Sequence, residues 1–372
     1  MNKLKYNYLW VLLLTLVGLL PEYIIRCNLN IMWFFYNTFS TYYGDLWYCW
    51  MNYLQKGFPY PAEYPSGIQI IFRAIYYLFD IREDYISYFI IISVFLAFSA
   101  IISSLLLYRI KPDMKKLLIF WIFAPSFMFY GLLNMDFLPI LTLVLAHYCF
   151  TQKRYYSTVI FLALGAFIKV FPIFLLPIYL LSIASNRLRV KLAITFVIVF
   201  VGLNLPFILF DYSAWSFPYI WQISSNMARN STDGSWTWLV YQLFDYFGVA
   251  NYSGKVSLLI FTIAYFQIIS KTWKSVSLEQ KLVVVMLLFL LTDRVYSPQY
   301  DLYLLPFLFL ANYRVNLRWF YLLEIINVAQ VFFCFWLKNH TIYLQLIVFS
   351  KYAFLILLLI DCLSIKNQNS NA

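Results

Sequence analysis

Residues 44–69 read GDLWYCWMNYLQKGFPYPAEYPSGIQ and form the first long interruption in a very apolar chain. The segment carries two acidic residues, Asp45 and Glu63, and three prolines among many aromatic side chains. Because proline cannot continue a helix, this segment must turn. One long apolar run precedes it and another follows it, which predicts that the segment lies at a membrane surface.

The composition of the rest of the chain points to the same environment. The 372 residues are 63% hydrophobic and only 12% charged, with a mean hydropathy of +0.74. Soluble domains average about 25% charged residues, so this chain has too little polar surface for a soluble globule. A β-barrel would alternate polar and apolar residues in short segments, whereas this sequence has continuous apolar runs. The net charge of +11 does not indicate nucleic-acid binding, because the basic residues are spread between those runs.

The apolar runs predict a single all-α polytopic membrane domain over residues 1–372, with about 12 membrane-spanning helices. Several runs are short or contain proline, which favours half-buried pairs of helices. Residues 68–79 are too short to span and predict an interfacial helix in the first outer loop. The spans are expected at 7–26, 85–108, 116–131, 134–150, 156–169, 171–185, 191–210, 255–271, 281–294, 300–313, 317–337 and 342–363.

The charges predict the topology. Every expected inner loop contains Lys or Arg, which predicts that both termini lie in the cytoplasm. No targeting signal is recognised, so the plasma membrane is the expected location. The first 27 residues, basic and then apolar, indicate an uncleaved anchor. Most acidic residues fall on the outer side, and the two long loops, 27–84 and 211–254, are also outer. This distribution favours chemistry on the outer face.

Asp45 is the first candidate for that chemistry. As an ionised carboxylate it can accept a proton from a hydroxyl group, and partial burial would tune it for that task. The alternative is a loop aspartate that caps a helix beginning at Leu46. Asp136, in GLLNMDF, is the second acidic candidate, because a carboxylate at a tight turn between apolar helices is unfavourable unless it is solvated or used. It can equally serve, like Asn134, as an N-cap.

Three basic residues, Lys169, Arg229 and Arg294, are expected at the outer ends of helices. Each can bind the phosphate of a lipid, and each can instead form a salt bridge or extend to the membrane surface. Glu324 lies within an expected span, and Arg318 or Lys351 could pair with it.

The sequence offers no other recognisable centre of chemistry. His147 and His340 are the only histidines and are expected to be structural, and the five cysteines lack metal-site spacing. Glycine-rich nucleotide loops, GxSxG and HExxH are absent. We therefore expect neither a metal nor a cofactor.

Four motifs in order resemble the GT-C superfamily of membrane glycosyltransferases, and within it glycosyltransferase family 87. They are GDLWYCW with KGFPY and EYPSG, then FAPSFMFYGLLNMDFLPILTLVLA, then LGAFIKVFPIFLLPIYLL, then SPQYDLYLLPFLFL. The match covers most of residues 40–310. Tyr64-Pro65-Ser66 stands where the family has Tyr-Pro-Pro, and Asn134 replaces the usual Gln. The first loop has no DxD pair, so the resemblance does not extend to a bound metal.

The resemblance implies a function for each motif. The enzyme would move a hexose or pentose, mannose as the first guess, from a polyprenyl-phosphate donor to a lipid or glycan acceptor on the outer face. Asp45 would be the general base of a single displacement, and Lys169, helped by Arg229 or Arg294, would face the leaving phosphate. Asp136 would orient sugar or acceptor, and the motifs add Tyr64, Gln299 and Tyr300 to the substrate-binding residues.

Two other functions remain open at this point. A secondary transporter or lipid-linked glycan flippase would place charges on broken helices, and Lys169 and Glu324 are the residues that favour it. A non-catalytic subunit of a glycan-assembly complex would keep the fold, although the presence of Asp45 favours catalysis.

Overall fold

The computed structural model describes residues 2–28, 46, 49–54, 64–79, 84–223, 246–248, 252–272, 276–293, 296–311, 315–336 and 341–364. Within these residues the chain is all-α, with 15 α-helices joined by short π- and 3₁₀-helical turns. The all-α part of the predicted fold class is thereby confirmed. The chain divides into two compact units: unit 1 holds most of the chain up to Ile220, and unit 2 holds Ala124–Ser126 and the chain from Trp221 onward.

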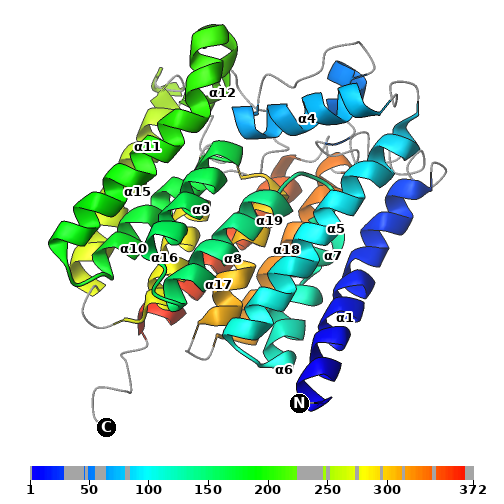
Figure 1. Cartoon of the computed structure of the whole chain (residues 1–372). Coiled ribbons are helices and arrows are strands. Elements are labelled where there is room, and N and C mark those ends of the chain that lie inside the picture. The colour runs from blue at the N-terminus through cyan, green and yellow to red at the C-terminus, as the bar shows by residue number, and fades with distance from the viewer. Residues whose placement is uncertain are drawn as a thin grey trace. The chain divides into compact units, whose positions relative to one another are not determined.

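Unit 1 is built on a row of helices. In order across the row these are α1 (Asn2–Cys27), α5 (Tyr85–Ile110), α8 (Phe137–Thr151), α9 (Tyr155–Ile168) and α11 (Asn186–Phe210), each packed on the next (Figure 1). Shorter elements connect the row, namely η1 (Trp50–Leu54), α6 (Met114–Leu117), η2 (Leu118–Ile122), α7 (Pro125–Tyr130), η3 (Phe171–Leu175), α10 (Leu176–Leu181) and α12 (Tyr212–Ile223).

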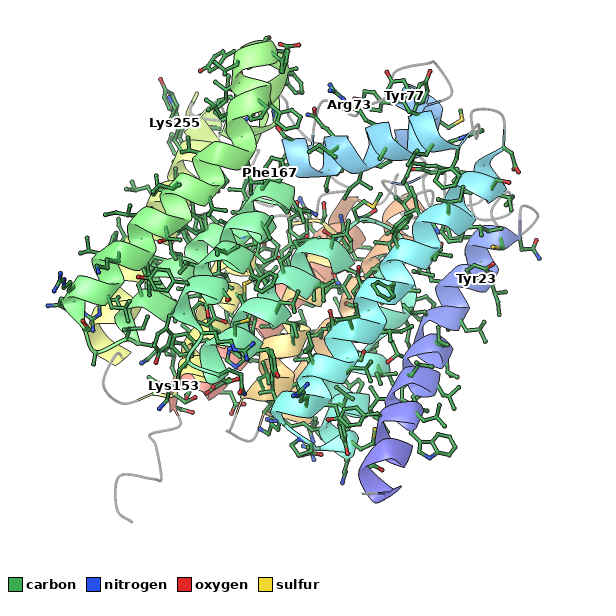
Figure 2. All side chains as sticks on the ribbon, in the orientation of Figure 1. Tyr23, Arg73, Tyr77, Lys153, Phe167 and Lys255 are labelled. Carbon is green, nitrogen blue, oxygen red and sulfur yellow. The ribbon has the colours of Figure 1, made fainter. Side chains whose placement is uncertain are left out.

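Local sequence sets where the helices of the row begin and end. Asp84 is the N-cap of α5, and its side chain accepts a hydrogen bond of 2.9 Å from the backbone N–H of Ile86. The turn between α8 and α9 is short, and Lys153 there adopts a left-handed φ of 58°. Figure 2 shows Lys153 and Phe167 at opposite ends of α9, so that α9 carries the chain back along α8.

Helix α4 (Ser66–Leu78) lies across the ends of the row (Figure 1). Its first turn meets the last turn of α9 so closely that only glycine fits. A Cβ on Gly67 would lie 2.8 Å from the carbonyl oxygen of Phe167 and 2.9 Å from the Cα of Ile168. The helix expected at 68–79 is thus present, and one of its faces is buried on unit 1 while Tyr77 and Leu78 are exposed.

Unit 2 has a second set of packed helices. Helices α15 (Ser253–Thr272), α16 (Leu278–Thr292), α19 (Thr341–Ser364) and α18 (Leu317–Trp336) pack in that order. A 3₁₀ turn, η6 (Pro298–Tyr303), and the short α17 (Leu305–Leu310) pack against α16, and η6 also contacts α18. All of η6 after Pro298 and all of α17 are buried.

The expectation of about 12 spans is wrong. Among the described residues, four helices are long and apolar enough to cross a membrane: Asn7–Cys27, Tyr85–Ile110, Asn186–Phe210 and Gln345–Ser364. These four suggest a membrane protein and agree with four of the expected runs. The apolar pattern located the helices correctly, but it did not give their lengths.

Proline and early termination shorten the other runs. The run 116–131 is divided before Pro125, the run 171–185 becomes a 3₁₀ turn and the short α10, and the run 300–313 becomes η6 and α17. Helices α8 and α9 have 15 and 14 residues. At 1.5 Å per residue they are about 21–23 Å long, shorter than the roughly 30 Å of a bilayer core.

The contact at Gly67 gives a prediction about stability. Gly67→Ala should destabilise the folded chain by about 1–3 kcal/mol, because backbone atoms of α9 cannot move aside as a side chain would. The matched control is Gly202→Ala in α11, where a Cβ meets no atom within 4 Å. That change should stabilise by up to about 1 kcal/mol through helix propensity. Thermal unfolding in detergent measures both changes. A Gly67→Ala variant as stable as wild type would contradict the close approach of α4 and α9.

Candidate functional site

The candidate site of unit 1 is built on a tight turn between α7 and α8. Residues 131–136 form this turn, and all six are buried. Gly131 permits it, since a Cβ there would lie 2.6 Å from the carbonyl oxygen of Phe127 and 2.7 Å from the ring of Phe137. Asp136 is the last residue of this turn and directly precedes α8 (Phe137–Thr151).

Asp136 occupies the N-cap position of α8 but does not act as a cap. Its side chain makes no capping hydrogen bond, and it is only 1% exposed. Its carboxylate instead forms an ion pair with the Lys169 ammonium, in which Lys169 Nζ donates to Asp136 Oδ1. The cost of burying this carboxylate is therefore offset by a charged partner and by the positive end of the α8 dipole.

Lys169 reaches Asp136 from the end of α9. It is the C-cap residue of that helix and has an extended backbone, with φ −152° and ψ 135°. The 3₁₀ turn that begins at Phe171 carries Pro172 in its first positions, so the chain cannot continue α9. The Lys169 side chain remains 17% exposed, whereas that of Asp136 is closed off. Of the two side chains in the pair, only that of Lys169 is therefore partly accessible.

The proline-containing segment of the first loop meets the same helix end. Pro65 is the N-cap residue of α4, and Gln69 Nε2 donates a 2.8 Å hydrogen bond to the backbone carbonyl of Tyr64. Two residues after Pro65, Gly67 contacts Phe167 and Ile168, which directly precede Lys169. The structure thus brings the Tyr64 motif and the Lys169 motif together, as separate sequence motifs could not show.

The beginning of the first loop also reaches this region. The backbone N–H of Leu46 donates a hydrogen bond of 3.4 Å to the carbonyl oxygen of Leu133, in the turn that ends at Asp136. Leu46 is 2% exposed. Asp45, the predicted base, lies outside the described residues, as do Arg229 and Arg294.

The remaining predicted residues belong to unit 2. Gln299 and Tyr300 lie in η6 and are 5% and 8% exposed. Tyr300 stacks on Tyr303 with 5.5 Å between ring centroids. Tyr64, Asp136 and Lys169 belong to unit 1.

The structure corrects the partners expected for Glu324. This carboxylate is 1% exposed and accepts a 2.7 Å hydrogen bond from the backbone N–H of Ser126. Lys351 donates to Gln330 Oε1 at 2.6 Å. A polar stripe on α18 marks this region, with Glu324, Asn327 and Gln330 spaced at three residues and all buried. Sequence reasoning considered Glu324 alone, although the three-residue spacing placed all three side chains on one helix face.

The histidine and cysteine side chains that the structure describes form no metal-ligand group. His147 is buried, and its Nδ1 lies 3.2 Å from the Tyr179 hydroxyl. Cys27, Cys49, Cys149 and Cys362 form no disulfide with one another. Among the described residues no group of three or more His, Cys, Asp or Glu side chains could hold a metal ion.

Comparison with known proteins found no matching family model, no similar curated protein and no similar solved structure.

The ion pair gives a prediction that separates its two partners. Lys169→Met leaves a buried carboxylate without its cation and should destabilise the chain by about 1–3 kcal/mol, less than a fully buried pair because Lys169 is partly exposed. Asp136→Asn leaves a lysine that can turn to water and should be milder. The double variant should recover about 1 kcal/mol of the summed loss. The free energies of unfolding of wild type, the two single variants and the double variant measure this coupling. If the two single losses simply add in the double variant, the ion pair is contradicted.

Proposed function

We propose that the chain is an integral membrane glycosyltransferase that uses a sugar on a polyprenyl phosphate as its donor. The observation that carries the proposal is the meeting of three of the four motifs in unit 1. The Tyr64 segment contacts the end of α9 that leads into Lys169, and Lys169 pairs with Asp136. Leu46, the residue after Asp45 in the sequence, donates a backbone hydrogen bond to Leu133 in the turn before Asp136.

In this proposal the accessible Lys169 ammonium meets the phosphate of the donor. Without donor, Asp136 neutralises Lys169 and holds it in place. A bound phosphate would share the cation, which would then stabilise the negative charge that grows on the leaving oxygen. Arg229 or Arg294 would assist from the outer loops.

Asp45 would act as the base of a single displacement. The acceptor hydroxyl attacks the anomeric carbon, the bond from that carbon to the phosphate oxygen breaks, and the hydroxyl proton passes to the Asp45 carboxylate. The sugar is a hexose or pentose, with mannose as the first candidate, and the acceptor is a lipid or glycan. The site would face the outside of the plasma membrane, with both termini in the cytoplasm.

A secondary transporter or lipid-linked glycan flippase is the second candidate. It is favoured by the buried charges of unit 2, where Glu324 and Lys351 lie on α18 and α19 beside the interrupted segment η6–α17. Transporters place their ion sites on interrupted helices of this kind.

The test is transfer of radiolabelled sugar from polyprenyl-phosphate donors to membrane extract by the purified chain. Asp45→Asn should abolish product, and Lys169→Met should lower the rate by about 100-fold or more, as the loss of a transition-state cation does. Asp84→Asn, an exposed change in the same outer loop, should keep wild-type activity. Equal transfer by Asp45→Asn and wild type would remove Asp45 as the base. No transfer from any donor by a folded sample would favour the transporter.

A further inference from the structure

Among the described residues of unit 2, two carboxylates and one ammonium are buried near one another. Asp301 in η6, Glu324 in α18 and Lys351 in α19 are 0%, 1% and 0% exposed. Three different elements thus deliver charged side chains into a region without water contact. Ionised groups in such a place are unfavourable unless their charges balance.

Each carboxylate is held by one neutral donor. The Tyr296 hydroxyl donates to Asp301 Oδ1, and the Ser126 backbone N–H donates to Glu324 Oε2 at 2.7 Å. The other oxygens, Asp301 Oδ2 and Glu324 Oε1, have no hydrogen-bond partner among the described residues. Both are enclosed acceptors for which the described residues supply no donor.

Lys351 supplies the positive charge of this centre. Its Nζ donates to Gln330 Oε1 at 2.6 Å and lies 3.6 Å from the ring centroid of Tyr296, whose hydroxyl binds Asp301. One ammonium can balance only one of the two carboxylates. In the described part of unit 2, the phenol of Tyr296 interacts with both carboxylates, that of Tyr321 interacts with Glu324, and Tyr352 packs against the ring of Tyr296.

The surrounding backbone is fixed by the same helices. Asn327 Nδ2, one turn after Glu324 on α18, donates to the carbonyl oxygen of Pro298 at 2.6 Å. This bond ties α18 to the turn that leads to Asp301. The two carboxylates therefore belong to one connected polar centre rather than to separate buried sites.

We infer that Asp301 and Glu324 together bind one exchangeable proton, which balances the charge that Lys351 leaves uncompensated. A proton on one carboxylate creates an O–H donor, and the second carboxylate is an acceptor of matching strength. The site takes up a proton from water and releases it again, without any covalent step. This inference does not depend on the transferase proposal, and it would give the second candidate function its coupling ion.

Infrared spectroscopy of the purified full-length chain tests the charge count directly. Protonated carboxyl groups have a C=O stretching band that ionised carboxylates lack. Exposed Asp and Glu are ionised at neutral pH because their pKa values are about 4. Wild type should nevertheless retain a protonated-carboxyl band at neutral pH.

Variants then change the band in opposite directions. Asp301→Asn and Glu324→Gln should each remove it, because Lys351 then balances the remaining carboxylate. Lys351→Gln should about double its area, because both carboxylates must then be neutral. Asp361→Asn, which removes the half-buried α19 carboxylate that binds the backbone N–H of Asn316 at 3.1 Å, is the matched control and should leave the band intact.

Several outcomes would overturn the inference. Wild type without the band at neutral pH would do so even if no variant folds. A band that survives in folded Asp301→Asn and folded Glu324→Gln would assign the proton elsewhere. The spectra are recorded in a buffer whose only added cation is choline and then in sodium buffer. Loss of the wild-type band in sodium would show that Na⁺ displaces the proton and would identify a sodium site instead. Sugar-transfer assays on the same samples report separately on the proposed transferase.

Discussion

The close approach of α4 and α9 at Gly67 is the constraint on which the candidate site depends. It fixes the first turn of α4 against the backbone that leads into Lys169. Backbone packed on backbone leaves little freedom for adjustment, because no flexible side chain lies between the two elements. The loop segment with its prolines is thereby placed at one helix end, and the position of Lys169 follows from the same contact.

The ion pair between Asp136 and Lys169 completes this arrangement by joining the beginning of α8 to the end of α9. The carboxylate faces a positive helix end and the ammonium a negative one, so the pair is favourable to both helix dipoles. The two partners differ in exposure, since the Asp136 side chain is enclosed and that of Lys169 is partly accessible. This difference supports the proposal that Lys169 meets a negatively charged ligand.

The sequence predicted the positions of the helices better than their lengths. Continuous apolar runs located α1, α5, α11 and α19, but the breaks at Pro125, Pro172 and Pro298 turned other runs into short pieces. Asp136 and Lys169 were both recognised as candidates, yet their pairing could not be derived, since it depends on how α8 and α9 pack. The role of Asp301 was missed for the same reason. Asp45, Arg229 and Arg294 remain predictions.

The shortness of α8 and α9 has a consequence for the surrounding lipid. If both helices stand across a bilayer, about 8 Å of hydrocarbon thickness remains unmatched at their ends. Such hydrophobic mismatch is relieved by local thinning, which draws headgroups and water inward. Asp136 and Lys169 lie at those ends. A membrane depressed at this point would carry the phosphate of a lipid to the depth of the ammonium, so that the bilayer itself would deliver the charged group of a lipid-linked substrate.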